Sequence, residues 1–250
     1  AGRLALGERA RRRSAAAQAR LDGEMAAAKR MQMGILPNAA ATFPGETRFS
    51  IAAVSEPART VGGDLYDFFL LDERRLFFLV GDVAGKGPEA SLFMAISKSL
   101  CKSVALRDGA GIGRVLRQAN IEIGRDNSAM MFVTVFAGVL DVGTGALEFC
   151  CAGHEPPWRV TAAGAASRLA GVGGPPLCLL DDFDYPTDHA RLTPGETIFV
   201  VTDGVTEAAN RAGELFGVER TEATIRSLAG LKAAAAALAG LVEPVHAYAD

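Results

Sequence analysis

The sequence predicts an α+β fold in which antiparallel sheets carry helices on their faces. Three observations lead to this class. Strand-like segments occur as hairpins, with 65–71 and 76–81 joined across a charged turn at 72–75. A second pair, 131–140 and 146–151, is joined by a turn at 141–145. Helical pairs are inserted between hairpins, an order that favours antiparallel sheets over alternating β-α-β units.

Residues 1–37 are predicted to form an N-terminal linker helix that Pro37 ends, because the residue before a proline disfavours the helical conformation. Apolar residues recur at spacings of four and three, with one polar interruption. This seam consists of Leu21, Met25, Ala28, Gln32 and Ile35. Such a seam is typical of a coiled coil that makes a homodimer, or of an amphipathic helix packed on its own domain. The basic cluster nearby (Arg9, Arg11, Arg12, Arg13) is typical of a solvated helix face, or of a segment close to a membrane in a longer protein.

The remaining elements follow from periodicity and turn residues. We expect strands at 49–54, 158–160, 167–169 and 197–202. Helices are expected at 89–104, at 114–124 and over most of 214–250, where alanine gives high helix propensity. No repeat or low-complexity linker interrupts this order.

Composition sets limits on the class of protein. The chain has 250 residues, 49% of them apolar, which suits one sizeable domain with an extension or two small domains. A net charge of −3 gives no indication of a nucleic-acid partner. No apolar run approaches the roughly 18 residues of a membrane span, and the start carries no signal-peptide pattern. The four cysteines form no C-x-x-C pair and are interpreted as free thiols in a reducing cytoplasm: Cys101, Cys150, Cys151 and Cys178. The expected location is cytoplasmic, either alone or as the cytoplasmic part of a membrane-bound sensor.

Three aspartates share one local pattern. Asp64, Asp82 and Asp203 each adjoin an apolar strand and have glycine adjacent or close by. Hard divalent cations prefer carboxylate, carbonyl and water oxygens, and the sequence has no histidine-cysteine cluster for zinc. Strand ends that converge would hold two Mg²⁺ or Mn²⁺ ions about 3.5–4 Å apart. The alternative is that each Asp-Gly pair only marks a turn.

Two other phosphate-related interpretations fit poorly. A P-loop needs four residues between its glycines and a hydroxyl after the lysine, whereas three residues separate Gly81 from Gly85 and Gly87 follows Lys86. A receiver domain that is phosphorylated at Asp64 or Asp82 needs alternating strands and helices, which the hairpins contradict.

Five motifs in order resemble the bacterial PP2C-like serine/threonine phosphatases of the stage-II-sporulation-E and sigma-B-regulator type. The resemblance covers about residues 30–220, including the helix end Gln32-x-x-Ile35-Leu36-Pro37. The motifs are Val61-Gly62-Gly63-Asp64-Leu65-Tyr66-Asp67, Gly81-Asp82-Val83-Ala84-Gly85-Lys86-Gly87, Met131-Phe132-Val133-Thr134, Ala152-Gly153-His154 and Thr202-Asp203-Gly204-Val205-Thr206-Glu207-Ala208.

The resemblance implies a four-layer α-β-β-α sandwich over residues 38–250 with a two-metal site for Mn²⁺ or Mg²⁺. Asp82 would bridge both ions, the Val83 carbonyl and Asp64 would serve one of them, and Asp203 would bind the other. Metal-bound water would be the nucleophile. The implied substrate is a phosphorylated anti-sigma-factor antagonist, dephosphorylated in a partner-switching pathway.

The sequence departs from the family at its end. The family normally closes with a strand that carries an Asp-Asp pair, one member being a further metal ligand, and this chain stops at Tyr248-Ala249-Asp250 without that strand. Either the chain is truncated or the site lacks a ligand. A non-catalytic partner-binding module is therefore the alternative function.

Three further residues have two interpretations each, and a fourth, Asp67, has one. Arg59 would meet a substrate phosphate or be solvated, and Lys86 would attract anions or lie free on a surface loop. His154 would act as a general acid or make a structural hydrogen bond in its turn. Asp67, three residues after Asp64, is expected on the opposite face of its strand.

Overall fold

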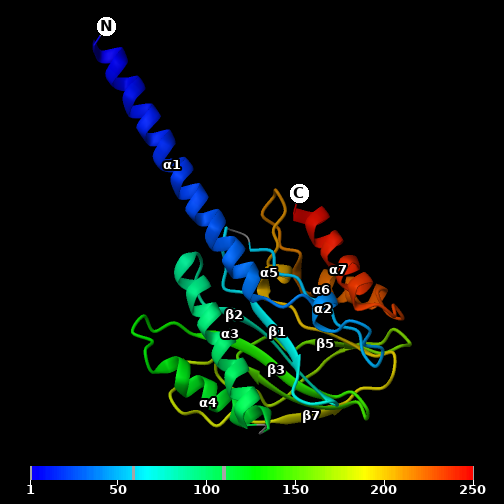
Figure 1. Cartoon of the computed structure of the whole chain (residues 1–250). Coiled ribbons are helices and arrows are strands. Elements are labelled where there is room, and N and C mark those ends of the chain that lie inside the picture. Colours follow the sequence, from blue (N-terminus) through cyan, green and yellow to red (C-terminus); the bar gives the residue numbers. More distant parts are fainter. Residues whose placement is uncertain (1, 58–59, 109–110, 250) are drawn as a thin grey trace.

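The protein is a four-layer sandwich with a long helix projecting from it, as the computed structural model shows (Figure 1). The structure describes residues 2–57, 60–108 and 111–249. Two antiparallel sheets form the centre, and helices cover their outer faces. The predicted fold class, a four-layer α-β-β-α sandwich of two antiparallel sheets preceded by an N-terminal helix, is confirmed.

The larger sheet has five strands in the order β1-β2-β3-β4-β7. Its strands are β1 (Leu65–Leu70), β2 (Arg75–Val83), β3 (Val133–Asp141), β4 (Ala146–Ala152) and β7 (Asp188–Arg191). The predicted hairpins are both present, since Leu65 pairs with Gly81 in the first and Leu140 pairs with Leu147 in the second. Strand β7, which the sequence pattern did not predict, adds an edge beside β4.

The smaller sheet has three strands in the order β6-β5-β8. They are β5 (Trp158–Val160), β6 (Ala166–Arg168) and β8 (Thr197–Phe199). The predicted strand at 49–54 is wrong, because this segment lies outside both sheets. Side chains hold it instead: Phe49 packs edge-on against Phe43 with ring centroids 5.1 Å apart, and the Ser50 hydroxyl accepts a hydrogen bond from the Ala234 amide.

Three apolar cores separate the four layers. The first lies between the larger sheet and the helices α3 (Pro88–Asp108) and α4 (Ile112–Gly124). The second lies between the sheets and contains Phe136, Phe149 and Leu169. The third lies between the smaller sheet and the helices α6 (Gly217–Ser227) and α7 (Ala234–Ala249), around Trp158. Each fully buried side chain of this size contributes about 1.5–3 kcal/mol, so the layers stabilise one another.

The N-terminal helix α1 (Gly2–Ile35) leaves the sandwich at a steep angle, and its N-terminal half extends away from the other elements (Figure 1). Its C-terminal end contacts the domain, where Gln32 and the residue just after the helix, Leu36, are buried, whereas Leu21 and Met31 are exposed. Two short helices, α2 (Ala39–Thr42) and α5 (Asp203–Thr206), complete the elements. The division into a linker (1–37) and a phosphatase domain (38–250) stays a prediction.

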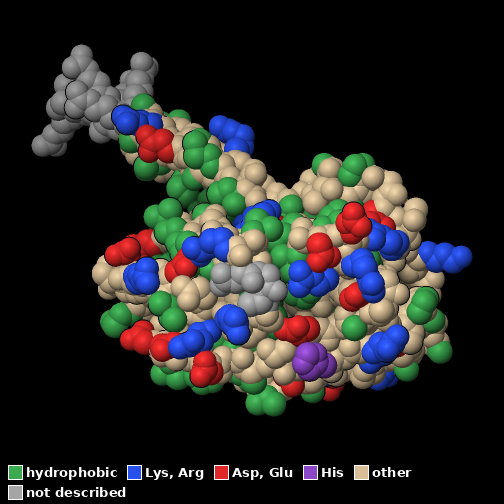
Figure 2. Space-filling view, turned by 60° about the horizontal axis from the view of Figure 1, so that its bottom comes forward, with side chains coloured by type: hydrophobic (Ala, Val, Ile, Leu, Met, Phe, Trp, Pro, Cys, Tyr) green, Lys and Arg blue, Asp and Glu red, His purple; other side chains and the backbone are tan. Residues whose placement is uncertain are grey.

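Surface charge is mixed on the face shown in Figure 2, where acidic and basic side chains lie among one another. Among the described residues, no helix has both the length and the hydropathy that crossing a bilayer requires. All four cysteines are free thiols, with Cys101 and Cys150 fully buried.

Candidate metal-dependent active site

The candidate site lies at one end of the larger sheet, where three chain segments meet. Asp64 directly precedes β1, Asp82 is the second-last residue of β2, and Asp203 begins α5 after the segment that follows β8. Because β1 and β2 are antiparallel, the start of one lies beside the end of the other, with Leu65 opposite Gly81. The fold therefore brings together residues that are far apart in the sequence.

Asp64 and Asp82 are in direct contact. Their carboxyl groups lie within hydrogen-bonding reach of each other, and Asp64 also accepts a hydrogen bond from the Thr202 side chain. Both aspartates are half-buried, whereas Asp203 is exposed. Thr202 was not singled out from the sequence, although its place directly before Asp203 could have suggested it.

Burial raises the pKa of Asp82 to about 7, and the negative charges of Asp64 and Asp203 add to this rise. Burial also raises the pKa of Asp64, with the charge of Asp203 acting in the same direction and the Thr202 hydrogen bond opposing it. Lys86 partly offsets the effect on Asp82. Two carboxyl groups with a raised pKa, next to a third carboxyl group, form an acidic centre that a bound divalent cation would stabilise.

Glycine allows the two ligand-bearing loops to approach each other closely. A Cβ atom on Gly63 would lie 2.7 Å from the Val83 carbonyl oxygen and 2.9 Å from Oδ1 of Asp82. The Val83 amide donates a hydrogen bond of 3.4 Å to the Gly63 carbonyl. Only a residue without a side chain fits at position 63, so the Asp64 segment packs on the backbone of the Asp82 segment.

The donor set fits a hard divalent cation but is not a preformed cage. Asp64, Asp82 and the Val83 carbonyl offer oxygen atoms from adjoining segments, which is the ligand type that Mg²⁺ and Mn²⁺ prefer. Among the described residues, no three acidic, histidine or cysteine groups are close enough to hold an ion on their own. Asp203 therefore lies near enough to influence the other carboxyl groups without joining them in a closed cluster.

Of the other residues singled out from the sequence, some lie near the candidate site and others lie elsewhere in the protein. His154 is buried, its Nδ1 lies 2.9 Å from the Glu155 carbonyl oxygen, and its charge interaction with Asp203 places it near the site. Asp67 is paired with Lys98 of α3. Lys86 is exposed beside Asp82. Arg59 lies outside the described residues.

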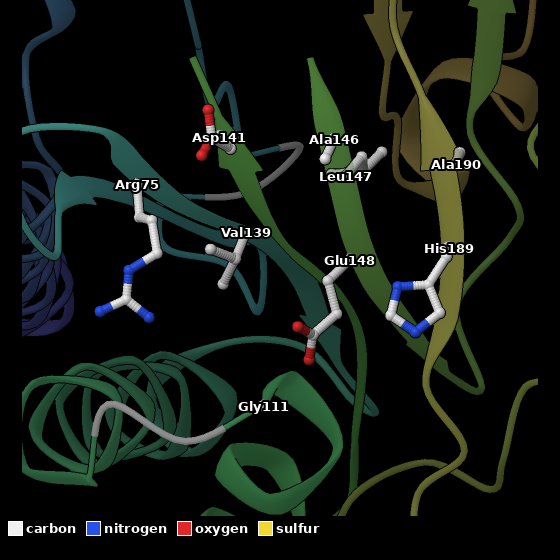
Figure 3. Close-up of a pocket in the computed structure, with 9 residues that line it drawn as sticks. All are labelled: Arg75, Gly111, Val139, Asp141, Ala146, Leu147, Glu148, His189 and Ala190. Carbon is white, nitrogen blue, oxygen red and sulfur yellow. The ribbon is translucent and has the colours of Figure 1, made fainter. Parts of the chain in front are cut away.

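A separate pocket of about 390 Å³ lies at the far end of the larger sheet. Figure 3 shows Arg75, Glu148 and His189 beside it, together with Gly111. Arg75 pairs with Asp141 at the start of β2, whereas Asp82 lies near the end of that strand. The pocket is therefore remote from the three aspartates.

Comparisons with known proteins agree with this architecture. A family model described as Stage II sporulation protein E (SpoIIE) matches residues 72–250. Protein IcfG of Synechocystis sp. is 32% identical over 228 residues, covering 81% of this chain and 35% of that protein. Phosphoserine phosphatase RsbU of Bacillus subtilis is 30% identical over 172 residues, covering 69% of this chain and 51% of that protein. The chain thus spans about half or less of the length of these relatives.

A solved structure supports the fold assignment over nearly the whole chain. The SiaA-PP2C domain of Pseudomonas aeruginosa superposes with a TM-score of 0.80 at 21% identity, and the match covers 94% of this chain and 93% of that domain. At this identity the likeness concerns the fold alone. Together with the match of the family model to most of the chain, it leads to one conclusion: the chain belongs to the SpoIIE family of PP2C-type phosphatase domains.

Proposed function

We propose that this protein is a metal-dependent phosphoprotein phosphatase that acts on phosphoserine or phosphothreonine. The observation that carries the proposal is the contact between Asp64 and Asp82, with Asp203 close enough to raise the pKa of both. PP2C-type phosphatases as a class depend on Mn²⁺ or Mg²⁺. Two such ions, when bound, would supply an activated water and neutralise charge on the phosphoryl group.

The chain's own residues have distinct roles in this proposal. Asp82 would contact both ions, Asp64 and the Val83 carbonyl would hold one of them, and Asp203 would hold the other. Lys86, exposed beside Asp82, favours the approach of an anionic phosphate.

The proposed substrate is a phosphorylated antagonist of an anti-sigma factor, in a partner-switching pathway. The similarity to RsbU, whose name describes it as a phosphoserine phosphatase, supports a phosphoserine substrate. The choice of an antagonist protein rests on the resemblance of the five motifs to the sigma-B-regulator type. The four free thiols fit a reducing cytoplasm as the working location.

We also propose that α1 pairs two chains into a homodimer. Its N-terminal half extends beyond the domain, and Leu21 and Met31 are 54% and 73% exposed although they are large apolar side chains. A second α1 would bury them as a coiled coil does. Sedimentation equilibrium that gives a monomer at high micromolar concentration would remove this part of the proposal.

One observation favours a second candidate, a module that binds a partner without dephosphorylating it. The described residues hold no closed three-group metal cluster, and Asp203 is exposed. Such a module would bind a phosphoprotein without turnover.

Hydrolysis of p-nitrophenyl phosphate and of a phosphoserine protein with Mn²⁺ separates the two candidates. We expect turnover with Mn²⁺ that EDTA abolishes and added Mn²⁺ restores, because the ions would activate the water. Turnover that survives chelation would contradict a metal-dependent mechanism. Mn²⁺ binding without turnover on either substrate would favour the non-catalytic module.

A further inference from the structure

Two neighbouring loops expose large apolar side chains at the end of the larger sheet where Asp82 lies. The first joins α4 to β3 and carries Met130, which is 86% exposed. The second, residues 177–184, carries Leu179 and Leu180, which are 54% and 51% exposed. We call these three side chains the apolar rim. A single exposed apolar side chain is ordinary, whereas three on adjoining loops are typical of a contact surface.

Backbone hydrogen bonds join the two loops to each other and to the candidate metal site. Val133 and Leu177 form an antiparallel bridge, with N–O distances of 3.1 and 2.9 Å. Because the bridge is antiparallel, the chain before Val133 and the chain after Leu177 leave it in the same direction. Val133 also pairs with Val83, whose carbonyl is a proposed metal ligand. Three residues span at most about 10 Å, so Met130 lies within reach of a protein bound at that site.

An asparagine side chain holds each loop in place. Asn120 of α4, only 2% exposed, accepts a hydrogen bond of 2.5 Å from the Cys178 amide and donates one of 2.9 Å to the Leu180 carbonyl. Asn127 accepts a hydrogen bond of 2.9 Å from the Met131 amide and donates one of 2.6 Å to the carbonyl of the same residue. A loop that is fixed before binding loses little conformational entropy when a partner contacts it.

The backbone of both loops contains residues in the left-handed conformation. Among the described residues, three that are not glycine have a positive φ: Met130 at 50°, Cys178 at 68° and Asp182 at 45°. All three lie in these two loops. Glycine would adopt such a conformation without strain, whereas other residues rarely do. Strained residues held by their surroundings are concentrated at sites that bind ligands.

Acidic side chains border the apolar rim. Asp181, Asp182 and Asp184 follow Leu180 in the same loop, and all three are exposed. Arg117 of α4 pairs with Asp182 at 2.6 Å and with Asp184 at 3.1 Å. One guanidinium group does not balance three carboxylates, so this border carries a net negative charge. A partner that complements it has basic side chains beside apolar ones.

We propose that the apolar rim and its acidic border dock the phosphoprotein substrate and select a phosphoserine that is flanked by apolar and basic side chains. This inference rests on the proposed function and names the substrate class of the same site. Charge complementarity favours a basic substrate over a second copy of this chain, because two copies docked rim to rim would place aspartates against aspartates.

Two phosphoserine peptides of equal length test the proposal. One carries leucine and arginine about three to five positions from the phosphoserine on both sides, and the other carries serine and glutamate there. The two docking variants are the double substitution Met130→Gln with Leu179→Gln, and the charge reversal Asp181→Lys. The matched control is Leu231→Gln, because Leu231 is 44% exposed and lies between α6 and α7, in the helix layer over the smaller sheet.

Fluorescence anisotropy measures the dissociation constant of each labelled peptide, in EDTA so that no turnover occurs. We expect the wild type and Leu231→Gln to bind the leucine-arginine peptide about tenfold more tightly than the serine-glutamate peptide. Both docking variants should lose most of this preference at an unchanged melting temperature. The double variant removes apolar contact area, and the charge reversal repels arginine.

The outcomes separate this inference from the proposed function. Wild-type protein that does not hydrolyse p-nitrophenyl phosphate with Mn²⁺ overturns the proposed function, whichever peptide it binds. Wild-type turnover of that compound together with equal dissociation constants for the two peptides overturns only the docking surface. A preference that persists in both docking variants would also contradict the assignment, because the selecting contacts would then lie elsewhere.

Discussion

Replacing Asp82 with asparagine is expected to lower Mn²⁺-dependent hydrolysis by about a thousandfold or more while making the metal-free protein more stable at pH 8. The first effect follows because Asp82 is the carboxylate that contacts Asp64 and interacts with Asp203. The second follows because a neutral amide avoids burying a negative charge beside two others. Loss of activity with a gain in stability distinguishes a functional residue from a structural one.

The pH dependence gives the size of the stability gain. The folded protein holds the pKa of Asp82 at about 7, above its usual 3.8, so the folded state binds more protons than the unfolded state between these values. Metal-free stability should therefore fall as pH rises from about 4 to about 7. The difference between the two pKa values corresponds to about 4 kcal/mol of unfolding free energy. Because Asp82 is partly exposed, solvent screening reduces the expected change in stability to about 1–2 kcal/mol.

Urea unfolding of the metal-free protein at pH 5 and pH 8 measures this effect, with Asp126→Asn as the matched control. Asp126 is exposed and lies on the loop after α4. We expect Asp82→Asn to be more stable than the wild type at pH 8 and to show a flatter pH profile. If Asp82→Asn unfolds more easily than Asp126→Asn at pH 8, the acidic centre described here is wrong.

Replacing Lys98 with methionine should cost about 3 kcal/mol of unfolding free energy, the largest stability effect expected from a single charge. Its Nζ lies 2.7 Å from Oδ2 of Asp67, and the two side chains are 7% and 0% exposed. Without Lys98, the fully buried carboxylate keeps the hydrogen bond from the Phe68 amide and, as a cationic partner, Lys102, whose Nζ is 3.6 Å away and which is 40% exposed. The buried pair joins α3 to β1, so its loss weakens the contact between helix and sheet.

The control is Lys102→Met, which removes the more exposed partner and should cost less than about 1 kcal/mol. Replacing both buried partners, as Asp67→Leu with Lys98→Met, should recover much of the loss because no unpaired charge remains. Denaturant unfolding of the four proteins compares these values. Equal costs for the Lys98 and Lys102 variants would show that the Asp67 carboxylate does not depend on its buried partner.

Local sequence was sufficient for the features that depend on neighbouring residues. The hairpin turns and the apolar strands predicted the antiparallel sheets, and Pro37 predicted the end of α1. The pattern of a carboxylate with nearby glycine at strand ends predicted Asp64 and Asp82 as candidate ligands. Their closeness follows from the hairpin, in which Leu65 lies opposite Gly81. Asp203 was predicted by the same pattern, but its distance from the pair depends on how the two sheets pack.

Features that depend on distant partners could not be predicted in this way. The apolar segment 49–54 has the composition of a strand, yet no neighbouring strand pairs with it, and β propensity alone does not supply one. Strand β7 has the opposite character: its sequence, Asp188–Arg191, is polar, and pairing with β4 makes it a strand. Tertiary context decides both cases.

Two buried polar contacts show the same limit. Gln32 was interpreted as a polar residue in an apolar seam, but its partner is Gly62, 30 positions away. Asp67 was considered for its distance from Asp64, whereas its partner, Lys98, lies 31 positions away on α3. Nothing in the spacing of either residue indicates those partners.

The central claim is that Asp64, Asp82 and Asp203 form one acidic site that holds divalent cations. Calorimetric titration of Mn²⁺ into the wild type and into Asp203→Asn tests it most directly, because Asp203 belongs to a different layer of the fold from the other two. We predict saturable binding to the wild type that is weakened at least about tenfold in the variant. Binding that is identical in the two proteins would contradict a site shared by the three aspartates.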